Sequence, residues 1–482
     1  MNRLSLRYFS CCLSLIACGF LFGKTDRLET QSLETQGYPA NLMAVAAKST
    51  TIKPISDDPL LEKLKKLPGV EVEKKSPSRD YKNQYVLKVT QPLDHEDPES
   101  GTFVQYVYLS VVDTDKPMVM ITAGYATSGS GKRELAEIFD ANQVTVEHRY
   151  YGLSVPNPVV WKHLTIKQSA DDLHHVRELL APLFPNKWIS TGVSKGGETA
   201  LLYRRFYPDD VDATVAYVAP INLAQEDPRL DDFIFNKLGT AESRAKISNF
   251  QLELLKRRES LIPKLKKYAQ RRNMKFSIGY DVAFEYAVVE YPFAFWQYGV
   301  GVDKIPTSDS NDDEIFRHLL SASMFELYSD RGIKRYEASF YQHMIELGYY
   351  GFKTDHLEGL LTAVPNPTNL AFGPKGVDMT YREGVMQDIH DWLVNKGDKI
   401  IYIYGGLDAW SGTAIELQGK TDALKLVHPT GAHGTNLRSF PKREQKKVYR
   451  LFKKWLSIPI HRLDKVSKTQ GIGNLGSSPE FP

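Results

Sequence analysis

Ser194 is the first of three side chains that could form a nucleophilic catalytic group. It stands at the centre of 192–196, which reads Gly-Val-Ser-Lys-Gly and matches the pattern G-x-S-x-G. In that pattern the serine occupies a sharp turn between a strand and a helix, and the flanking glycines permit the turn. A short expected strand at 188–191 precedes the motif, and a helix-compatible run at 198–206 follows it. This context predicts that Ser194 is a nucleophile.

A serine hydroxyl needs a neighbouring base, and the C-terminal part of the chain offers both an acid and a base. Asp408 follows the apolar run 400–404, and His433 follows the run 424–427 in a glycine-containing loop. Alone, an aspartate after a strand is usually a turn residue and a lone histidine is usually structural. Together with Ser194 they predict a Ser-His-Asp triad, because all three follow expected strands in the order serine, acid, base.

Acyl transfer also needs backbone N–H groups that hold the developing oxyanion. We expect Lys195, directly after the nucleophile, to supply one, and Tyr125, in the loop after the run 118–121, to supply the other. The same glycine-rich loop does not fit a phosphate-binding loop. Ala126 stands at the first glycine position, and Arg133 stands where Ser or Thr would bind magnesium.

Composition places the chain among ordinary globular proteins. It has 482 residues, 42% of them hydrophobic and 25% charged, with a formal net charge of +3. This small excess argues against a nucleic-acid-binding protein. The adjacent His174 and His175 have no cysteine or further histidine at zinc-binding spacing. We therefore expect no metal, no cofactor and no nucleic-acid partner, while the oligomeric state is left open.

The first 23 residues are typical of an export signal. Arg3 and Arg7 precede the apolar run 8–22, which is shorter than a membrane-spanning helix requires. Residues 15–18, Leu-Ile-Ala-Cys, also resemble a lipobox, so Cys18 is a candidate lipid anchor, with plain secretion as the alternative. We expect an exported protein, secreted or held in the periplasm or cell envelope, whose mature chain has no transmembrane span. All three cysteines lie in this segment, so we expect no disulfide in the mature body.

Short apolar runs that alternate with helical patterns predict a mostly parallel sheet with crossover helices. After a hairpin of 84–89 and 103–112, strands are expected at 118–121, 144–147, 188–191, 213–218, 400–404 and 424–427. The helix that contains Leu173 and Leu180 is expected to begin at a capping box of Ser169 and Asp172.

The alternation stops between about Leu223 and Met379, where helical patterns such as 249–267 and 313–327 predict a helical cap inserted into the α/β core. The expected parts are a signal segment (1–23), an N-terminal tether (24–80), two core segments (81–222 and 380–464), the helical cap (223–379) and a disordered tail (465–482).

Several of these stretches resemble known exported peptidases. Residues 194–197, 204–212 and 215–220 closely resemble serine peptidase family 37, the secreted tripeptidyl-aminopeptidase family of filamentous bacteria. Residues 91–95 and 147–152, together with Phe103 to Tyr106, resemble the related Pro-X carboxypeptidase and dipeptidyl-peptidase family. The likeness runs from about Gln91 to Leu456.

This resemblance implies an α/β-hydrolase fold with a helical cap and the triad Ser194, Asp408 and His433. It also implies an exported serine peptidase that releases short, often proline-containing peptides from free N-termini. One residue departs from the family: Glu198 stands where an apolar residue such as Met is expected. Its effect on helix packing or on the pocket is left open.

An exopeptidase of this kind needs a carboxylate that pairs with the substrate's ammonium group. Glu285 and Glu290 are candidates, because both stand among the aromatic residues of 284–296, which could form an apolar pocket for proline. The alternative is that these aromatics are the core of the helical cap and that the acids are solvated. Glu147 is a rival anchor, although its place at the end of a buried strand favours a structural role.

The expected function is therefore that of an exported serine exopeptidase that releases short peptides, tripeptides among them, from free N-termini. We expect it to favour proline-containing substrates and to act through an acyl-enzyme. Two alternatives remain on the same fold, a carboxylesterase or lipase and a Pro-X carboxypeptidase, because a fold does not fix its substrate. From another class, a catalytically silent peptide-binding surface protein is the third alternative.

Overall fold

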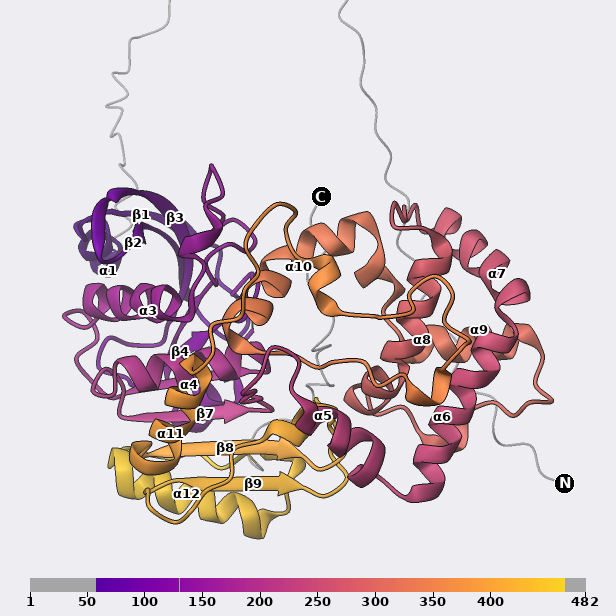
Figure 1. Ribbon diagram of the computed structural model, residues 1–482. Coiled ribbons are helices and arrows are strands. Elements are labelled where there is room, and N and C mark those ends of the chain that lie inside the picture. Colours follow the sequence, from indigo (N-terminus) through magenta and orange to yellow (C-terminus); the bar gives the residue numbers. More distant parts are fainter. Residues whose placement is uncertain (1–57, 130, 464–482) are drawn as a thin grey trace, which may run out of the picture. The chain divides into compact units, whose positions relative to one another are not determined.

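The computed structural model describes residues 58–129 and 131–463. Nine strands form one sheet in the order β1-β2-β3-β5-β4-β6-β7-β8-β9 (Figure 1). The strands are β1 Val70–Lys75, β2 Asn83–Asp94, β3 Asp97–Val111, β4 Met118–Thr122, β5 Asn142–Val146, β6 Trp188–Val193, β7 Ala213–Tyr217, β8 Ile400–Gly405 and β9 Leu424–His428. Strands β1, β2 and β3 pair antiparallel in that order, and β3 also pairs antiparallel with β5. The other neighbours, from β5 through β4, β6, β7 and β8 to β9, pair parallel.

Helices cover both faces of the parallel part. They are α2 Glu134–Phe139, α3 Ile166–Leu180, α4 Lys195–Phe206, α11 Val385–Lys396 and α12 Lys442–Leu456. Alternate residues of a strand point to opposite faces, so Val119 and Ile121 of β4 pack with α2 and α12, whereas Met118 and Met120 belong to the core that contains α3. Helices α4 and α11 share a further core on the β7 and β8 part of the sheet. This three-layered arrangement is the α/β-hydrolase fold, and the fold class predicted from the sequence is confirmed.

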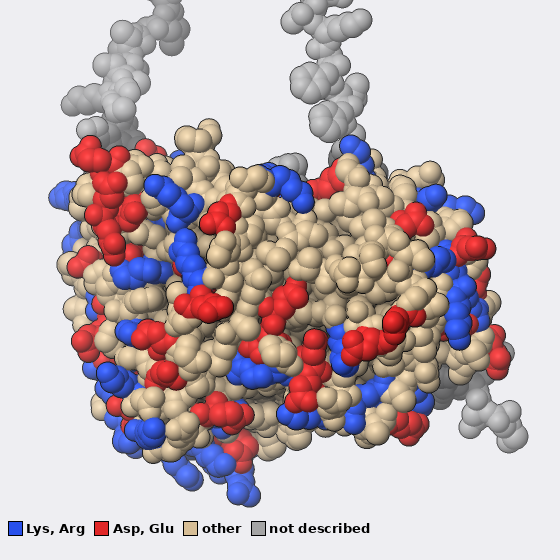
Figure 2. Space-filling view, in the orientation of Figure 1, with Lys and Arg blue, Asp and Glu red and all other residues tan. Residues whose placement is uncertain are grey.

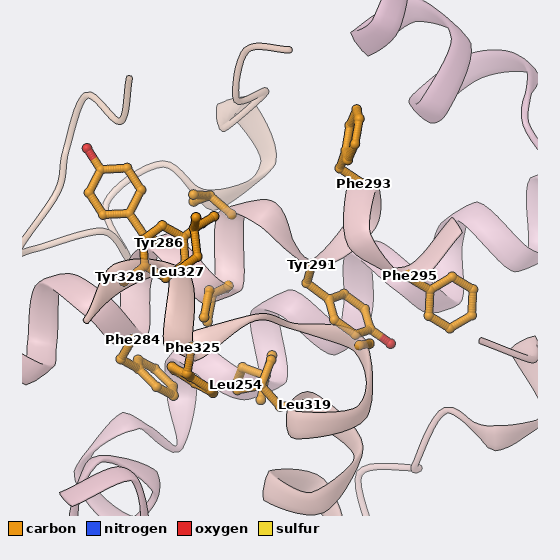
Figure 3. Close-up of a cluster of buried hydrophobic side chains, with 14 of the residues drawn as sticks. Leu254, Phe284, Tyr286, Tyr291, Phe293, Phe295, Leu319, Phe325, Leu327 and Tyr328 are labelled. Atoms are coloured by element: carbon orange, nitrogen blue, oxygen red, sulfur yellow. The ribbon is translucent and has the colours of Figure 1, made fainter. Parts of the chain in front are cut away.

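The helical cap contains a second large core. Its helices are α5 Pro228–Asp232, α6 Ala241–Lys256, α7 Arg258–Arg271, α8 Tyr280–Gln297, α9 Asp312–Ala322 and α10 Asp330–Gln342. Helix α8 is buried on every side from Ala283 to Trp296, as expected for a helix that is apolar all round. Figure 3 shows its aromatic side chains among Leu254 of α6, Leu319 of α9 and Tyr328. The arrowheads of β8 and β9 point towards α5 and the cap in Figure 1.

The sheet begins earlier in the chain than the sequence indicates. Part of the expected tether forms α1 (Pro59–Leu64) and strand β1, which pairs with β2. Strand β1 lies at the edge of the sheet, and its Val-Glu-Val-Glu alternation at 70–73 was overlooked because the run is short and stands in a charged stretch. The predicted hairpin is present as β2 and β3, which run several residues further towards each other than expected.

Two local predictions in helices are wrong. Helix α3 begins at Ile166, and its N-cap is Thr165, whose side chain accepts from the Gln168 N–H. Ser169 lies inside the helix and donates its hydroxyl to the Thr165 carbonyl, so no capping box forms with Asp172. The long helix expected at 249–267 is two helices, α6 and α7, which meet at Arg257.

The face of the molecule seen in Figure 2 carries basic and acidic side chains interspersed around a broad uncharged area. Among the described residues, no helix is long and apolar enough to span a membrane. The expected export signal and the C-terminal tail lie outside the described residues.

Candidate active site

Ser194 occupies a strained turn between β6 and α4. Its backbone has φ 56° and ψ −131°, a conformation that residues with a side chain rarely adopt. The Ser194 N–H donates to the Tyr217 carbonyl of β7 at 2.9 Å. A Cβ at Gly192 would lie 2.0 Å from the Gly196 carbonyl oxygen, so this turn requires glycine there. The G-x-S-x-G motif therefore has the strand, turn and helix that its interpretation demands.

Asp408 and His433 come together at the carboxyl ends of β8 and β9. His433 Nδ1 lies 2.8 Å from Asp408 Oδ2, the distance of a hydrogen bond in which the imidazole donates. The Asp408 side chain is fully buried, and its Oδ1 accepts from the Trp410 N–H at 3.2 Å. The arrangement fixes which imidazole nitrogen carries the proton and leaves Nε2 as the basic atom.

Backbone hydrogen bonds join the loops that carry these two residues. The Gly406 N–H donates to the His428 carbonyl at 2.7 Å, and the Leu407 N–H donates to the Gly431 carbonyl at 2.8 Å. The His433 N–H donates to the carbonyl of Gln297, the last residue of α8, at 3.1 Å. The position of His433 is therefore set by the sheet and by the helical cap together.

The loop after β4 packs directly against the turn at Ser194. A Cβ at Gly124 would lie 2.6 Å from the Gly196 nitrogen and 2.8 Å from Lys195 Cβ, so only glycine permits this approach. Within the described part of the chain, the N–H groups of Tyr125 and Lys195 have no protein acceptor. Neither donor is used by the described chain, and their role as oxyanion donors stays a prediction.

Glu285 is committed to the fold of the helical cap. It is fully buried and accepts from the N–H groups of Thr362, Ala363 and Val364 and from the Arg258 guanidinium, which lies 2.6 Å away. Burial alone would raise the pKa of Glu285, but these donors hold it below its ordinary value. Its oxygens are occupied by its own chain, which argues against the predicted role in binding a substrate amine.

Glu290 lies in a different environment. It is buried, and its two oxygens accept from the hydroxyls of Tyr328 at 2.7 Å and Tyr350 at 3.1 Å. Burial raises the pKa of Glu290, against the effect of these two hydroxyls. The Tyr350 ring stacks on Phe293 with centroids 4.0 Å apart and meets the Trp410 ring edge-on at 5.8 Å. One aromatic layer therefore separates Glu290 from the loop of Asp408.

Glu147 is a structural acceptor. Its carboxylate accepts from the N–H groups of Thr127 and Leu153, both at 3.0 Å, and from the Ser154 hydroxyl at 2.7 Å. These bonds hold the turn after β5 in place, and burial raises the pKa of Glu147 against their effect. No three His, Cys, Asp or Glu side chains gather as a metal site in the described ranges 58–129 and 131–463.

Two charged side chains behind the nucleophile were not recognised as a pair from the sequence. Lys195 and Glu198 are both buried in the first turn of α4. The Lys195 ammonium donates to the Gly124 carbonyl at 3.0 Å. Neither oxygen of Glu198 has a hydrogen-bond partner among the described residues. The sequence signal that could have found them is their position next to Gly192, Gly196 and Gly197, where the start of a buried helix was expected.

Comparisons with known proteins place these observations in a family. Residues 54–468 match the family described as PS-10 peptidase S37. The prolyl tri/tetrapeptidyl aminopeptidase of Streptomyces mobaraensis is 32% identical over 434 residues, which cover 88% of this chain and 90% of that protein. The thymus-specific serine protease of Homo sapiens is 27% identical over 157 residues, which cover 28% of this chain and 30% of that protein.

A solved structure, the proline iminopeptidase of Mycobacterium smegmatis, aligns with 76% of this chain and 96% of its own at 13% identity and a TM-score of 0.36. The family match spans most of the chain, and the Streptomyces relative is covered almost throughout. The chain therefore belongs to the peptidase S37 family and is a serine peptidase.

Proposed function

We propose that this serine peptidase is an exported exopeptidase that removes short peptides, tripeptides above all, from free N-termini and favours proline-containing substrates. The observation that carries the proposal is the hydrogen bond between His433 Nδ1 and buried Asp408 at 2.8 Å, at the same edge of the sheet as the strained Ser194 turn. The printed name of the Streptomyces relative supports the substrate class.

In the proposed mechanism, His433 Nε2 takes the proton of the Ser194 hydroxyl while Oγ attacks the scissile carbonyl carbon. The N–H groups of Lys195 and Tyr125 hold the oxyanion. The imidazolium, stabilised by Asp408, then gives its proton to the leaving amine, and the acyl-enzyme remains. Water, activated by the same imidazole, hydrolyses that ester and regenerates the hydroxyl of Ser194.

We assign the substrate's ammonium group to Glu290 in preference to Glu285. The oxygens of Glu285 are saturated by backbone N–H groups and by Arg258, whereas each oxygen of Glu290 accepts from a single tyrosine hydroxyl. A carboxylate oxygen can accept more than one bond, so Glu290 retains capacity for an arriving ammonium.

The aromatic residues near Glu290 supply the apolar surface for proline. The Trp410 ring meets Phe293 at 4.8 Å, Tyr349 at 5.4 Å and Tyr350 at 5.8 Å between centroids. The indole N–H of Trp410 is buried and has no partner among the described residues. A buried donor left unpaired is costly, and a substrate carbonyl would satisfy it.

The deciding experiment compares hydrolysis of an Ala-Ala-Pro reporter amide whose N-terminus is free with hydrolysis of its acetylated form. We expect the wild type to cleave only the free form and the Ser194→Ala variant to cleave neither. Cleavage of both forms by the wild type would refute the amine anchor and favour an endopeptidase. Cleavage of neither form, with hydrolysis of short acyl esters, would favour an esterase, and release of a C-terminal residue would favour a carboxypeptidase.

Export is the second part of the proposal. It rests on the charged and apolar pattern of residues 1–23. The intact mass of the protein recovered from the cell envelope and the medium tests it. A mature chain without this segment supports export, lipid on Cys18 identifies an anchored form that Cys18→Ser should release, and an intact chain confined to the cytoplasm refutes it.

A further inference from the structure

The side chain of Lys195 is buried beside the proposed oxyanion site. Only 2% of the residue is exposed, which is rare for a lysine, because removing an ammonium from water is costly unless it is paired. Its Nζ donates to the Gly124 carbonyl at 3.0 Å and lies 5.7 Å and 5.3 Å from the ring centroids of Tyr125 and Tyr151. The ammonium thus contacts the loop that supplies the second oxyanion donor.

The atom that Lys195 contacts belongs to the same peptide group as that donor. The Gly124 carbonyl and the Tyr125 N–H share one planar peptide unit, in which they point in opposite directions. A bond that holds the carbonyl therefore also fixes the direction of the N–H. A charged donor on the carbonyl further polarises the amide, and hydrogen bonds in such chains strengthen one another.

Glu198 is a second buried ionisable side chain in the first turn of α4. It lies three residues along α4, on the same side of the helix as Lys195. Burial lowers the pKa of Lys195 to about 7, and the Glu198 charge opposes this fall. Burial likewise raises the pKa of Glu198 to about 8, and the Lys195 charge opposes this rise. The two side chains therefore depend on each other for their charge.

The other titratable groups that interact with Lys195 do not replace Glu198. His148, which follows β5, and His343, which follows α10, both feel the Lys195 charge. Burial lowers the pKa of both imidazoles, that of His343 to about 3, so both are neutral at neutral pH. Tyr125 and Tyr151 present their rings, and burial raises the pKa of each hydroxyl. Glu198 is thus the acid whose ionisation is coupled to that of Lys195.

We propose that the Lys195 side chain is a positioning residue for the oxyanion site: it orients and polarises the peptide group that presents the Tyr125 N–H, and Glu198 favours its charged form. Residue 195 would then serve catalysis twice, through its own N–H as a donor and through its ammonium on the second donor. This inference rests on the proposed function, since it assumes that Ser194 attacks a carbonyl at this site.

The test is the Lys195→Met variant, which keeps a long apolar side chain and removes the donor. We expect kcat for the free Ala-Ala-Pro amide to fall by about 10- to 100-fold, less than the roughly 10²- to 10³-fold loss that follows removal of a whole oxyanion donor. KM should change little, because the effect arises in the transition state. The affinity for a peptidyl trifluoromethyl ketone, which forms a tetrahedral adduct, should fall by a similar factor.

Lys187→Met is the matched control. Lys187 lies directly before β6 and forms an ion pair with Asp212. The Lys187 side chain is 42% exposed. This variant should keep the kcat and the inhibitor affinity of the wild type. A merely structural role for Lys195 would lower the melting temperature of Lys195→Met and leave the kcat of its folded fraction and its inhibitor affinity unchanged, and that result would overturn the proposal.

Glu198→Gln tests the inference even if Lys195→Met does not fold. Without the carboxylate, Lys195 loses its proton more easily, so we expect the alkaline decline of kcat to move to lower pH, while Glu198→Asp stays closer to the wild type. An unchanged profile would overturn the role of Glu198. Labelling of Ser194 by a fluorophosphonate distinguishes failure of the proposed function from failure of this inference. If the wild type is not labelled, the proposed function fails. If the wild type is labelled while Lys195→Met has the wild-type kcat, only this inference fails.

Discussion

Replacement of Asp408 by Asn is the sharpest test of the proposed triad. In the structure, Asp408 Oδ1 accepts from the Trp410 N–H and Oδ2 accepts from His433 Nδ1. An asparagine whose oxygen keeps the Trp410 bond must present its NH₂ group to His433. The NH₂ group only donates, so Nδ1 must become the acceptor and the proton must move to Nε2. The imidazole then cannot accept the proton of Ser194.

The expected loss is large because the wrong tautomer removes the general base. In another serine protease this change costs about 10⁴ in kcat, which corresponds to roughly 5.4 kcal/mol at about 1.36 kcal/mol per tenfold. The fold should survive, since Asn has the shape of Asp and can keep the Trp410 bond. The assay measures kcat on the free Ala-Ala-Pro amide, with the melting temperature as a check on folding.

The chain contains a matched control for this experiment. His174 Nδ1 and Asp210 Oδ2 form another histidine–aspartate pair, also at 2.8 Å, outside the site. Asp210→Asn should cost some stability, because Asp210 also accepts from the Tyr203 hydroxyl at 2.6 Å, but it should leave kcat unchanged. A folded Asp408→Asn variant with kcat within tenfold of the wild type would refute the assignment of Asp408.

Two further predictions concern the acids of α8. Glu290→Gln should raise KM for the free tripeptide amide by about 10- to 100-fold, as a lost charged hydrogen bond of about 1.5–3 kcal/mol implies, and equal KM values in wild type and variant would exclude Glu290 as the anchor. Glu285→Gln should instead lower the free energy of unfolding, by about 1–3 kcal/mol, with little effect on KM, as urea denaturation can measure. Because the folded pKa of Glu285 is lowered, this difference should be fully present above its ordinary pKa of 4.5 and should shrink as the pH falls through the folded pKa; a difference that grows at acidic pH would contradict it.

Much of the core could be predicted from the sequence because its signals are local. The strands β4, β6, β8 and β9 are short apolar runs, and a residue that directly follows such a run lies at the carboxyl edge of a parallel sheet. That rule was enough to bring Asp408 and His433 together, although they come from different strands. The family resemblance agreed with it.

The predictions failed where the deciding partner is distant or where a signal is ambiguous. Glu285 and Glu290 stand on one apolar helix and look alike in sequence, and only the loop 362–364 and the tyrosines of the cap distinguish them. The predicted N-cap Ser169 lies inside α3, whose N-cap is Thr165, four residues earlier. The charge of Lys195 normally indicates a solvent-exposed side chain, so its inward direction could not be read from residue type.

The bond between the His433 N–H and the carbonyl of Gln297 has a mechanical consequence. Helix α8 contains Glu290 and ends at Gln297. The proposed amine anchor therefore lies on this helix, and the proposed general base is hydrogen-bonded to its last residue. A shift of that helix along its axis would move both, so the proposed distance from the anchor to the scissile bond depends on this one helix, in which Pro292 lies between the two ends. On the proposed assignment, the cap would set the length of the peptide released, and a movement of α8 would act on His433 through this bond.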